Sequence, residues 1–201
     1  MTRLAPSFPL YVLAGGRSRR FGSDKARADF HGRALIQHVV DSLDEVSSSC
    51  TVVAAAKDAY ADLGFETIGD LVPGHGPLAG LETALCHAEK FGHPWVLLAS
   101  CDLVAAGPKA VTELANAVDP CSHSVAVFSS SRWYEPFPGL YSTASLPELR
   151  QMRGAADASM QGFFAAISER LHAVAPSNDS LPYCDANTVE QLAAYRHQQC
   201  G

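Results

Sequence analysis

Hydrophobic positions along the chain alternate between strand-like and helix-like periods. Residues 10–15, LYVLAG, form a short apolar run that is typical of a buried strand. Residues 34–46 follow with helical periodicity, and their apolar face consists of Leu35, Val39, Leu43 and Val46. A strand followed by an amphipathic helix is the opening of a βαβ unit, so the pattern predicts a parallel sheet from the start of the chain.

The same alternation continues to residue 118. It predicts strands at 51–56, 65–70 and 94–102 and helices at 76–92 and 108–118. Gly92 stands where it would end the first of these helices, and Pro108 where it would begin the second. Such alternation favours a mostly parallel sheet with helices on both faces, so the expected fold class is α/β with three αβα layers.

After residue 119 the pattern changes. Residues 124–131 and 136–143 predict two strands close enough in sequence to pair antiparallel at or near a sheet edge. Helices are expected at 144–152 and 159–171, a strand at 172–176 and a closing helix at 188–199. The segments 153–162 and 176–187 are rich in small and turn-forming residues but too short for domain linkers. We therefore expect one domain over residues 1–201.

The amino-acid composition argues against some classes of binding partner. The formal net charge of -6 gives no general attraction to nucleic acid or to an anionic membrane, so a small ligand is expected. The apolar run near the N-terminus is too short for a signal peptide or a membrane span, which predicts a cytoplasmic protein. The 6 cysteines contain no C-x-x-C pair and the 8 histidines no H-E-x-x-H motif, so reduced thiols without structural zinc are expected.

One basic cluster stands out in this acidic chain. In PLYVLAGGRSRRFGSDKA, residues 9–26, two glycines end the first predicted strand, at the edge where open α/β sheets bind ligands. Gly15 and Gly16 let the backbone approach a ligand closely. The cations that follow suit a polyphosphate and are Arg17, Arg19, Arg20 and Lys25. The spacing matches neither a P-loop nor G-x-G-x-x-G, and the alternative is a solvated basic loop.

Two acidic residues stand at other predicted strand ends. Asp102 follows the most hydrophobic strand, where a carboxylate facing a phosphate-binding loop would suit a divalent cation; its alternative role is a helix or turn cap. Asp70 precedes a turn rich in glycine and proline and either caps that turn or belongs to a site. Cations for phosphate oxygens together with carboxylates for Mg²⁺ predict a nucleotide site.

These residues carry a family resemblance. LAGGRSRRFGSDKA resembles the L-A-G-G-x-S-x-R-x-G-x-D-K signature of the molybdenum cofactor guanylyltransferases, the molybdopterin-guanine dinucleotide biosynthesis protein A family. Further matches run in the family's order: GPLAGL at 76–81, CD at 101–102, EPFPGLY at 135–141 and DANTVEQL at 185–192. The resemblance covers almost the whole chain, and the signature together with GPLAGL is its specific part.

The resemblance implies a fold and an activity. The fold is a Rossmann-like αβα sheet of the nucleotide-diphospho-sugar transferase type, mostly parallel with one antiparallel strand. The activity is transfer of GMP from Mg·GTP to the terminal phosphate of molybdopterin or Mo-molybdopterin, which releases pyrophosphate. The implied partners are therefore GTP and molybdopterin, without nucleic acid or membrane, and with transient contacts to other proteins of molybdenum cofactor synthesis.

The resemblance also assigns roles to individual residues. Arg20, Lys25 and Asp102 would carry catalysis, with Arg20 and Lys25 on the phosphates and Asp102 on Mg²⁺. The nucleotide would lie against Leu13, Ala14, Gly15, Gly16, Lys25, Asp70, Gly76 and Asp102. Asp185 and Asn187 would contact the acceptor, although either would serve equally well as the N-cap of the closing helix.

Departures from the family pattern leave alternatives open. Ala54 and Ala56 stand where relatives often carry an asparagine that helps to read the base. A related enzyme that uses CTP or a sugar phosphate is therefore one alternative. A non-catalytic GTP-binding cofactor carrier is another, although Arg20, Lys25 and Asp102 argue for chemistry.

Overall fold

The computed structural model describes residues 7–15, 24–72, 75–104, 106–130, 132–155 and 157–177. These residues form a seven-stranded sheet in the order β5-β4-β1-β6-β8-β7-β9. Its strands are β1 (Phe8–Leu13), β4 (Ser47–Ala54), β5 (Glu66–Gly69), β6 (Trp95–Ser100), β7 (Val125–Ser129), β8 (Tyr134–Ser142) and β9 (Leu171–Val174). The helices are α1 (Leu35–Leu43), α2 (Gly76–Lys90), α3 (Pro108–Ala117), α4 (Leu146–Gln151) and α5 (Met160–Ala166).

Pairing in the sheet confirms the expected fold class. β1 pairs in parallel with β4 and β6, β4 with β5, and β7 with β9. β8 runs antiparallel to both of its neighbours, β6 and β7. The predicted antiparallel pair is therefore present near one side of the sheet, but β9 pairs outside β7 and forms the edge.

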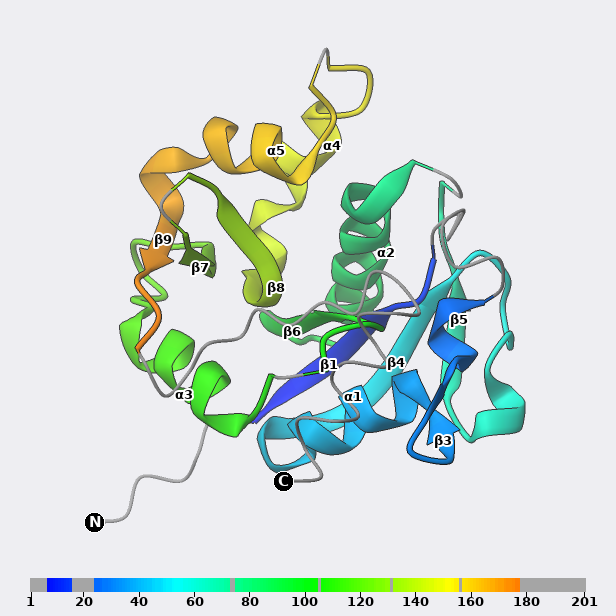
Figure 1. Ribbon diagram of the computed structural model, residues 1–201. Coiled ribbons are helices and arrows are strands. Elements are labelled where there is room, and N and C mark those ends of the chain that lie inside the picture. The colour runs from blue at the N-terminus through cyan, green and yellow to red at the C-terminus, as the bar shows by residue number, and fades with distance from the viewer. Residues whose placement is uncertain are drawn as a thin grey trace.

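Helices cover both faces of the sheet (Figure 1). Successive β1 residues alternate between two cores: Leu10 and Val12 face α1 and α3, while Tyr11 and Leu13 face α2, α4 and α5. This alternation follows from the period of two in a strand and confirms the three-layer arrangement. The predicted inner face of the 76–92 helix is confirmed, since Leu81, Leu85 and Ala88 are fully buried.

Local signals set several element boundaries. Gly92 has a φ of 73°, its N–H donates to the Glu89 carbonyl at 3.1 Å, and the His93 N–H donates to the Ala88 carbonyl at 3.0 Å. This is a Schellman motif, which ends α2 as the sequence predicted. Pro108 is the first residue of α3, also as predicted.

Other boundaries differ from the predicted ones. The helix expected over 34–46 ends at Leu43 and passes into a 3-10 turn, η2 (Asp44–Val46). The helix expected over 159–171 ends at Ala166, and a second 3-10 turn, η5 (Ser168–Arg170), leads directly into β9. A short hairpin before α1, β2 (Asp29–Phe30) with β3 (Arg33–Ala34), was not predicted. The closing helix expected at 188–199 lies outside the described residues.

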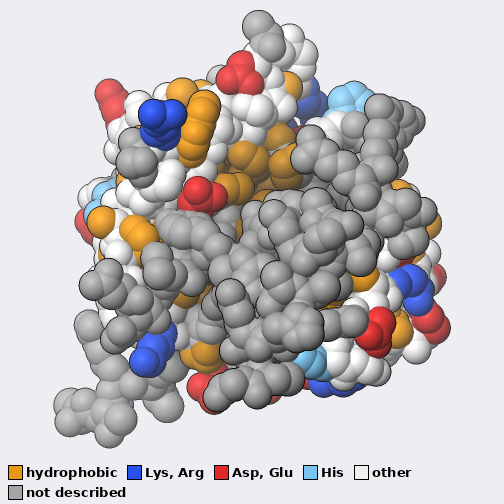
Figure 2. All heavy atoms as spheres, viewed as in Figure 1, with side chains coloured by type: hydrophobic (Ala, Val, Ile, Leu, Met, Phe, Trp, Pro, Cys, Tyr) orange, Lys and Arg blue, Asp and Glu red, His pale blue; other side chains and the backbone are white. Residues whose placement is uncertain are grey.

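Charged side chains of both signs are interspersed where Figure 2 colours the surface, and apolar side chains line a hollow below α4 and α5. Among the helices that the structure describes, none combines the length and the apolar character needed to cross a membrane.

Candidate functional site

The carboxyl ends of four neighbouring strands lie at one edge of the sheet, and their pairing continues just past the strands. The Ala14 N–H donates to the Val53 carbonyl at 2.9 Å, and the Cys101 N–H donates to the Leu13 carbonyl at 3.1 Å. The Asp70 N–H donates to the Ala54 carbonyl at 2.7 Å. Residues that follow β1, β5 and β6 are therefore held in register with the neighbouring strand ends, at the edge where open α/β sheets bind ligands.

A pocket of about 390 Å³ opens at this edge. Its described lining consists of Ala14, Gly15, Asp24, Lys25, Ala26, Ala54, Ala55, Ala56, Ala59, Tyr60 and Cys101. Three predicted site residues, Ala14, Gly15 and Lys25, are thus brought together. The wall that follows β4 presents alanine methyl groups and backbone.

Lys25 and Asp102 form an ion pair between their Nζ and Oδ2 atoms, although 77 residues separate them. Lys25 begins the 3-10 turn η1 (Lys25–Arg27), and Asp102 lies just past the end of β6. Their side chains are only 10% and 15% exposed, so water screens the pair weakly. This juxtaposition holds a carboxylate against a cation that lines the pocket, although Asp102 itself is not among the described lining residues. A cation for phosphate and a carboxylate for a metal ion are the groups that a nucleotide site needs.

Cys101 lines the same pocket beside this ion pair. Burial raises the pKa of its thiol to about 12, and the negative charge of Asp102 adds to the effect. The thiol therefore stays protonated at neutral pH, which argues against a role as nucleophile or thiolate ligand.

Asp24 and Tyr60 also line the pocket, and the sequence did not single them out as site residues. The Tyr60 hydroxyl lies 3.1 Å and 3.0 Å from the two Asp24 carboxylate oxygens and donates to that carboxylate. Burial and the nearby carboxylate raise the pKa of Tyr60 well above its usual value, so it stays a hydrogen-bond donor. Asp24 belongs to the quoted signature, but no local pattern distinguishes Tyr60 from an ordinary core residue.

Asp70 makes the contacts of a turn cap. Its Oδ1 atom accepts a hydrogen bond from the Val72 N–H at 3.1 Å. The Thr83 hydroxyl lies 3.1 Å from the same oxygen and 3.0 Å from the Ala79 carbonyl, so its one hydrogen is shared between these two acceptors. The Thr83 hydroxyl in turn accepts from the Leu71 N–H at 3.0 Å. Asp70 therefore ties the turn after β5 to α2, which is the first of the two roles that the sequence left open.

Replacing Thr83 by valine is expected to lower the free energy of unfolding by about 1–2 kcal/mol, because the Leu71 N–H and Asp70 Oδ1 each lose a partner. Urea denaturation measures the loss. Thr112→Val is the matched control, since the Thr112 hydroxyl makes a single helical bond to the Pro108 carbonyl. Equal losses in the two variants would contradict a special role for the Asp70 turn.

Leu13 and Gly76 lie on the side of the sheet that α2 covers. Gly76 is the first residue of α2 and has a φ of 75°. A Cβ at Gly80 would lie 3.0 Å from Leu13 Cδ2, so the second glycine of GPLAGL lets α2 approach the end of β1 closely. Four predicted site residues are not among the described residues that line the 390 Å³ pocket: Leu13, Asp70, Gly76 and Asp102. Of these, Asp102 reaches the lining through its ion pair with Lys25. The remaining predicted site residues, Gly16, Arg20, Asp185 and Asn187, lie outside the described residues.

A metal ion fits this site only together with phosphate ligands. No group of three or more histidine, cysteine, aspartate or glutamate residues is placed to hold a metal within the described ranges. Mg²⁺ is usually bound by one or two carboxylates plus substrate phosphates and water. The single carboxylate of Asp102 therefore suits a Mg²⁺ ion that is bound jointly with a nucleotide.

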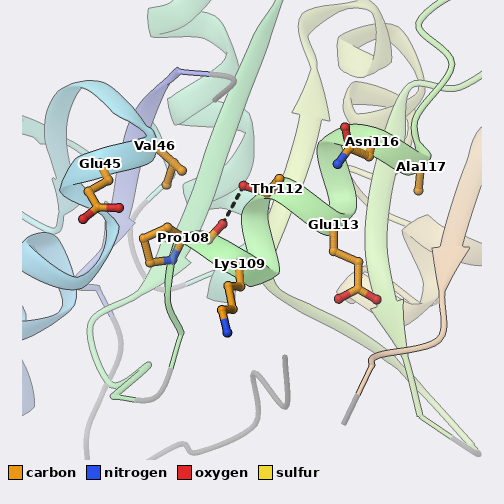
Figure 3. A pocket seen from close by; sticks show the side chains of 8 residues that line it. All are labelled: Glu45, Val46, Pro108, Lys109, Thr112, Glu113, Asn116 and Ala117. Atoms are coloured by element: carbon orange, nitrogen blue, oxygen red, sulfur yellow. Dashed lines mark hydrogen bonds between the residues drawn. The ribbon is translucent and has the colours of Figure 1, made fainter. Parts of the chain in front are cut away.

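A larger pocket, of about 730 Å³, lies between η2 and α3 (Figure 3). Glu45, Lys109 and Glu113 project around it, and none of the predicted site residues lines it. Both oxygens of Glu113 already contact Ser177, which donates from its N–H and its hydroxyl at 3.2 Å each. The size of this pocket does not make it the functional site, because the predicted site residues that line a pocket line the 390 Å³ one.

Comparison with known proteins agrees with the geometry. The family described as "MobA-like NTP transferase domain" matches residues 10–175. A probable molybdenum cofactor guanylyltransferase of Deinococcus radiodurans is 36% identical over 170 residues, which is 85% of this chain and 80% of that protein. A molybdenum cofactor guanylyltransferase of Pseudomonas putida is 29% identical over 193 residues, covering 93% and 96% of the two chains.

A similar fold is found in molybdopterin-guanine dinucleotide biosynthesis protein A from Archaeoglobus fulgidus. That structure superposes with a TM-score of 0.75 at 19% identity, covering 96% of this chain and 98% of its own. The fold, the match over residues 10–175 and the Deinococcus relative agree with the signature of the glycine-rich segment. The chain therefore belongs to the MobA-like NTP transferase family and is a nucleotidyltransferase.

Proposed function

We propose that this protein transfers GMP from Mg·GTP to the terminal phosphate of molybdopterin, which yields molybdopterin guanine dinucleotide and pyrophosphate. The names of the relatives support the reaction. The observation that carries the proposal is the ion pair between Asp102, just past the end of β6, and Lys25, which lines a pocket at the strand ends.

In the proposed reaction an oxygen of the acceptor phosphate attacks the α-phosphorus of GTP. A new oxygen–phosphorus bond forms, the bond from the α-phosphorus to the bridging oxygen breaks, and pyrophosphate leaves with that electron pair. The attacking phosphate is already ionised at neutral pH, so no general base is required. The protein contributes positioning and charge stabilisation, which are large effects in a partly desolvated site.

The remaining roles are those that the family resemblance implies. Lys25, together with Arg20, would neutralise phosphate charge, and Ala14, Gly15 and Gly16 would let the nucleotide approach the backbone. Leu13, Asp70 and Gly76 would support the nucleoside from the α2 side. Asp185 and Asn187 would contact the acceptor. Asp102 would hold Mg²⁺, which when bound would neutralise charge on the phosphates. A cytoplasmic location and transient contacts with other proteins of cofactor synthesis remain predictions of the sequence.

The alanine wall at the end of β4 leaves a second candidate open, transfer from CTP. Ala54, Ala55 and Ala56 offer methyl groups and backbone where a polar side chain could read the base edge. Pyrophosphate release should therefore be measured with each of the four NTPs, Mg²⁺ and molybdopterin. We expect GTP to give the highest kcat/KM. A higher value with CTP would overturn the guanine assignment.

The same assay tests the non-catalytic alternative. A cofactor carrier would bind GTP tightly yet release no pyrophosphate with molybdopterin, with Mo-molybdopterin or with a sugar-phosphate acceptor. Turnover with molybdopterin would exclude a carrier role as the whole function.

A further inference from the structure

Several donors surround the Asp24 carboxylate, which directly precedes Lys25 in the chain. Its Oδ1 atom accepts from the Ala26 N–H at 3.0 Å, which caps the start of η1. The Tyr60 hydroxyl approaches both carboxylate oxygens, and the Arg27 Nε atom lies 3.4 Å from Oδ2. Asp24 is therefore used to fix the turn whose first residue is Lys25.

Tyr60 reaches this carboxylate from the opposite wall of the pocket. It lies between β4 and the 3-10 turn η3 (Ala61–Leu63), and its side chain is almost fully buried in the core beneath the site. A buried hydroxyl needs a partner, and a bond to an ionised carboxylate is among the stronger kinds. The Tyr60 hydroxyl thus links the wall that follows β4 to the segment that carries Lys25.

Arg27 makes further contacts between the turn that contains Lys25 and the loop that contains Tyr60. Its guanidinium lies 5.1 Å from the centre of the Tyr60 ring, and its two terminal nitrogens donate to Asp62 at 2.7 Å each. It also donates to the Ala59 carbonyl at 2.7 Å. The turn containing Lys25 and the loop containing Tyr60 are therefore joined at several points, as expected of groups that must keep a catalytic cation in place.

We propose that Tyr60 is a positioning residue which, through Asp24, holds Lys25 in line with Asp102 and with the phosphates of the bound nucleotide. The inference rests on the proposed function for the identity of that nucleotide. Tyr60 would act through Lys25 and not by contacting the nucleobase, although its ring lines the pocket.

Tyr60→Phe removes only the hydroxyl and keeps the ring beneath Arg27. We expect kcat/KM for pyrophosphate release to fall about tenfold, because small displacements of a catalytic group are costly. Binding of Mg·GTP should weaken, whereas binding of guanosine, which has no phosphates, should be unchanged. Weaker guanosine binding would instead mean direct contact with the nucleoside and would overturn the inference.

Tyr11→Phe is the matched control. Tyr11 is also a buried tyrosine, and its hydroxyl hydrogen-bonds to His87 Nδ1 at 2.8 Å on the α2 side of the sheet. Both variants lose a buried hydroxyl bond, and Tyr60→Phe should lose somewhat more stability because its partner is a carboxylate. Only Tyr60→Phe should change kcat/KM, and an equal change in both would reveal a merely structural effect.

Two further measurements complete the test. In a Lys25→Ala background, Tyr60→Phe should have no additional effect on kcat/KM, whereas a persisting tenfold loss would contradict action through Lys25. Without any ligand, hydrogen exchange of the peptide spanning residues 24–28 should be faster in Tyr60→Phe than in the wild type or in Tyr11→Phe. If exchange rises but GTP neither binds nor reacts, the proposed function fails while the positioning role stands. If exchange is unchanged, the positioning role fails.

Discussion

Lys25→Ala is expected to lower kcat/KM for guanylyl transfer by roughly 10²- to 10³-fold, or about 3 to 4 kcal/mol of transition-state stabilisation. Lys25 lies at the rim of the pocket with its side chain 10% exposed, so its charge acts through little water. The negative charge that moves onto pyrophosphate during the reaction would lose a fixed cation. Pyrophosphate release with GTP, Mg²⁺ and molybdopterin measures the effect.

The same substitution is also expected to reduce stability, because it leaves the Asp102 carboxylate without its ammonium partner in a largely buried position. Activity should therefore be measured well below the melting temperature of the variant. Lys109→Ala, at an exposed lysine of α3 that is not among the described residues lining the 390 Å³ pocket, controls for loss of a positive charge. If both lysine variants kept wild-type kcat/KM, Lys25 would be a structural partner of Asp102 without a catalytic role.

Asp102→Asn is expected to lower kcat/KM by about 10²-fold and to raise the Mg²⁺ concentration that gives half-maximal rate. The amide keeps the size of the side chain but removes the charge that attracts both Lys25 and a hard cation. Titrating Mg²⁺ at saturating GTP should recover part of the activity, because a weakened site is filled at higher ion concentration.

Asp41→Asn is the control for Asp102→Asn. Asp41 also pairs with a cation, Arg33, but both side chains are exposed and lie on α1 and the preceding hairpin. Its substitution should leave both kcat/KM and the Mg²⁺ requirement unchanged. An unaltered Mg²⁺ dependence in Asp102→Asn would place metal binding at other residues.

Much of the architecture could be predicted from sequence because its causes are local. Apolar runs, helical faces and their alternation predicted the three layers, and Gly92 and Pro108 marked helix ends through their own backbone preferences. The glycine-rich segment indicated a nucleotide site because its glycines and cations are themselves the groups suited to binding phosphates. Elements whose ends depend on neighbours were predicted less well: α5 stops at Ala166, where the chain turns to pair with β7 as β9.

The sequence by itself thus determined the layers and the succession of the main strands and helices along the chain, and it predicted the edge of the sheet at which a ligand would bind. Only the tertiary structure decided which side chains meet there. Lys25 and Asp102 pair across 77 residues because β1 and β6 are neighbours in the sheet, and no local pattern specifies that pairing. The same holds for the Tyr60 hydroxyl on Asp24 and for Asp70, whose carboxylate closes a turn against Thr83. Contacts between distant segments depend on how the strands pack in the sheet, whereas helical and strand periodicity depends only on residues that are close in sequence.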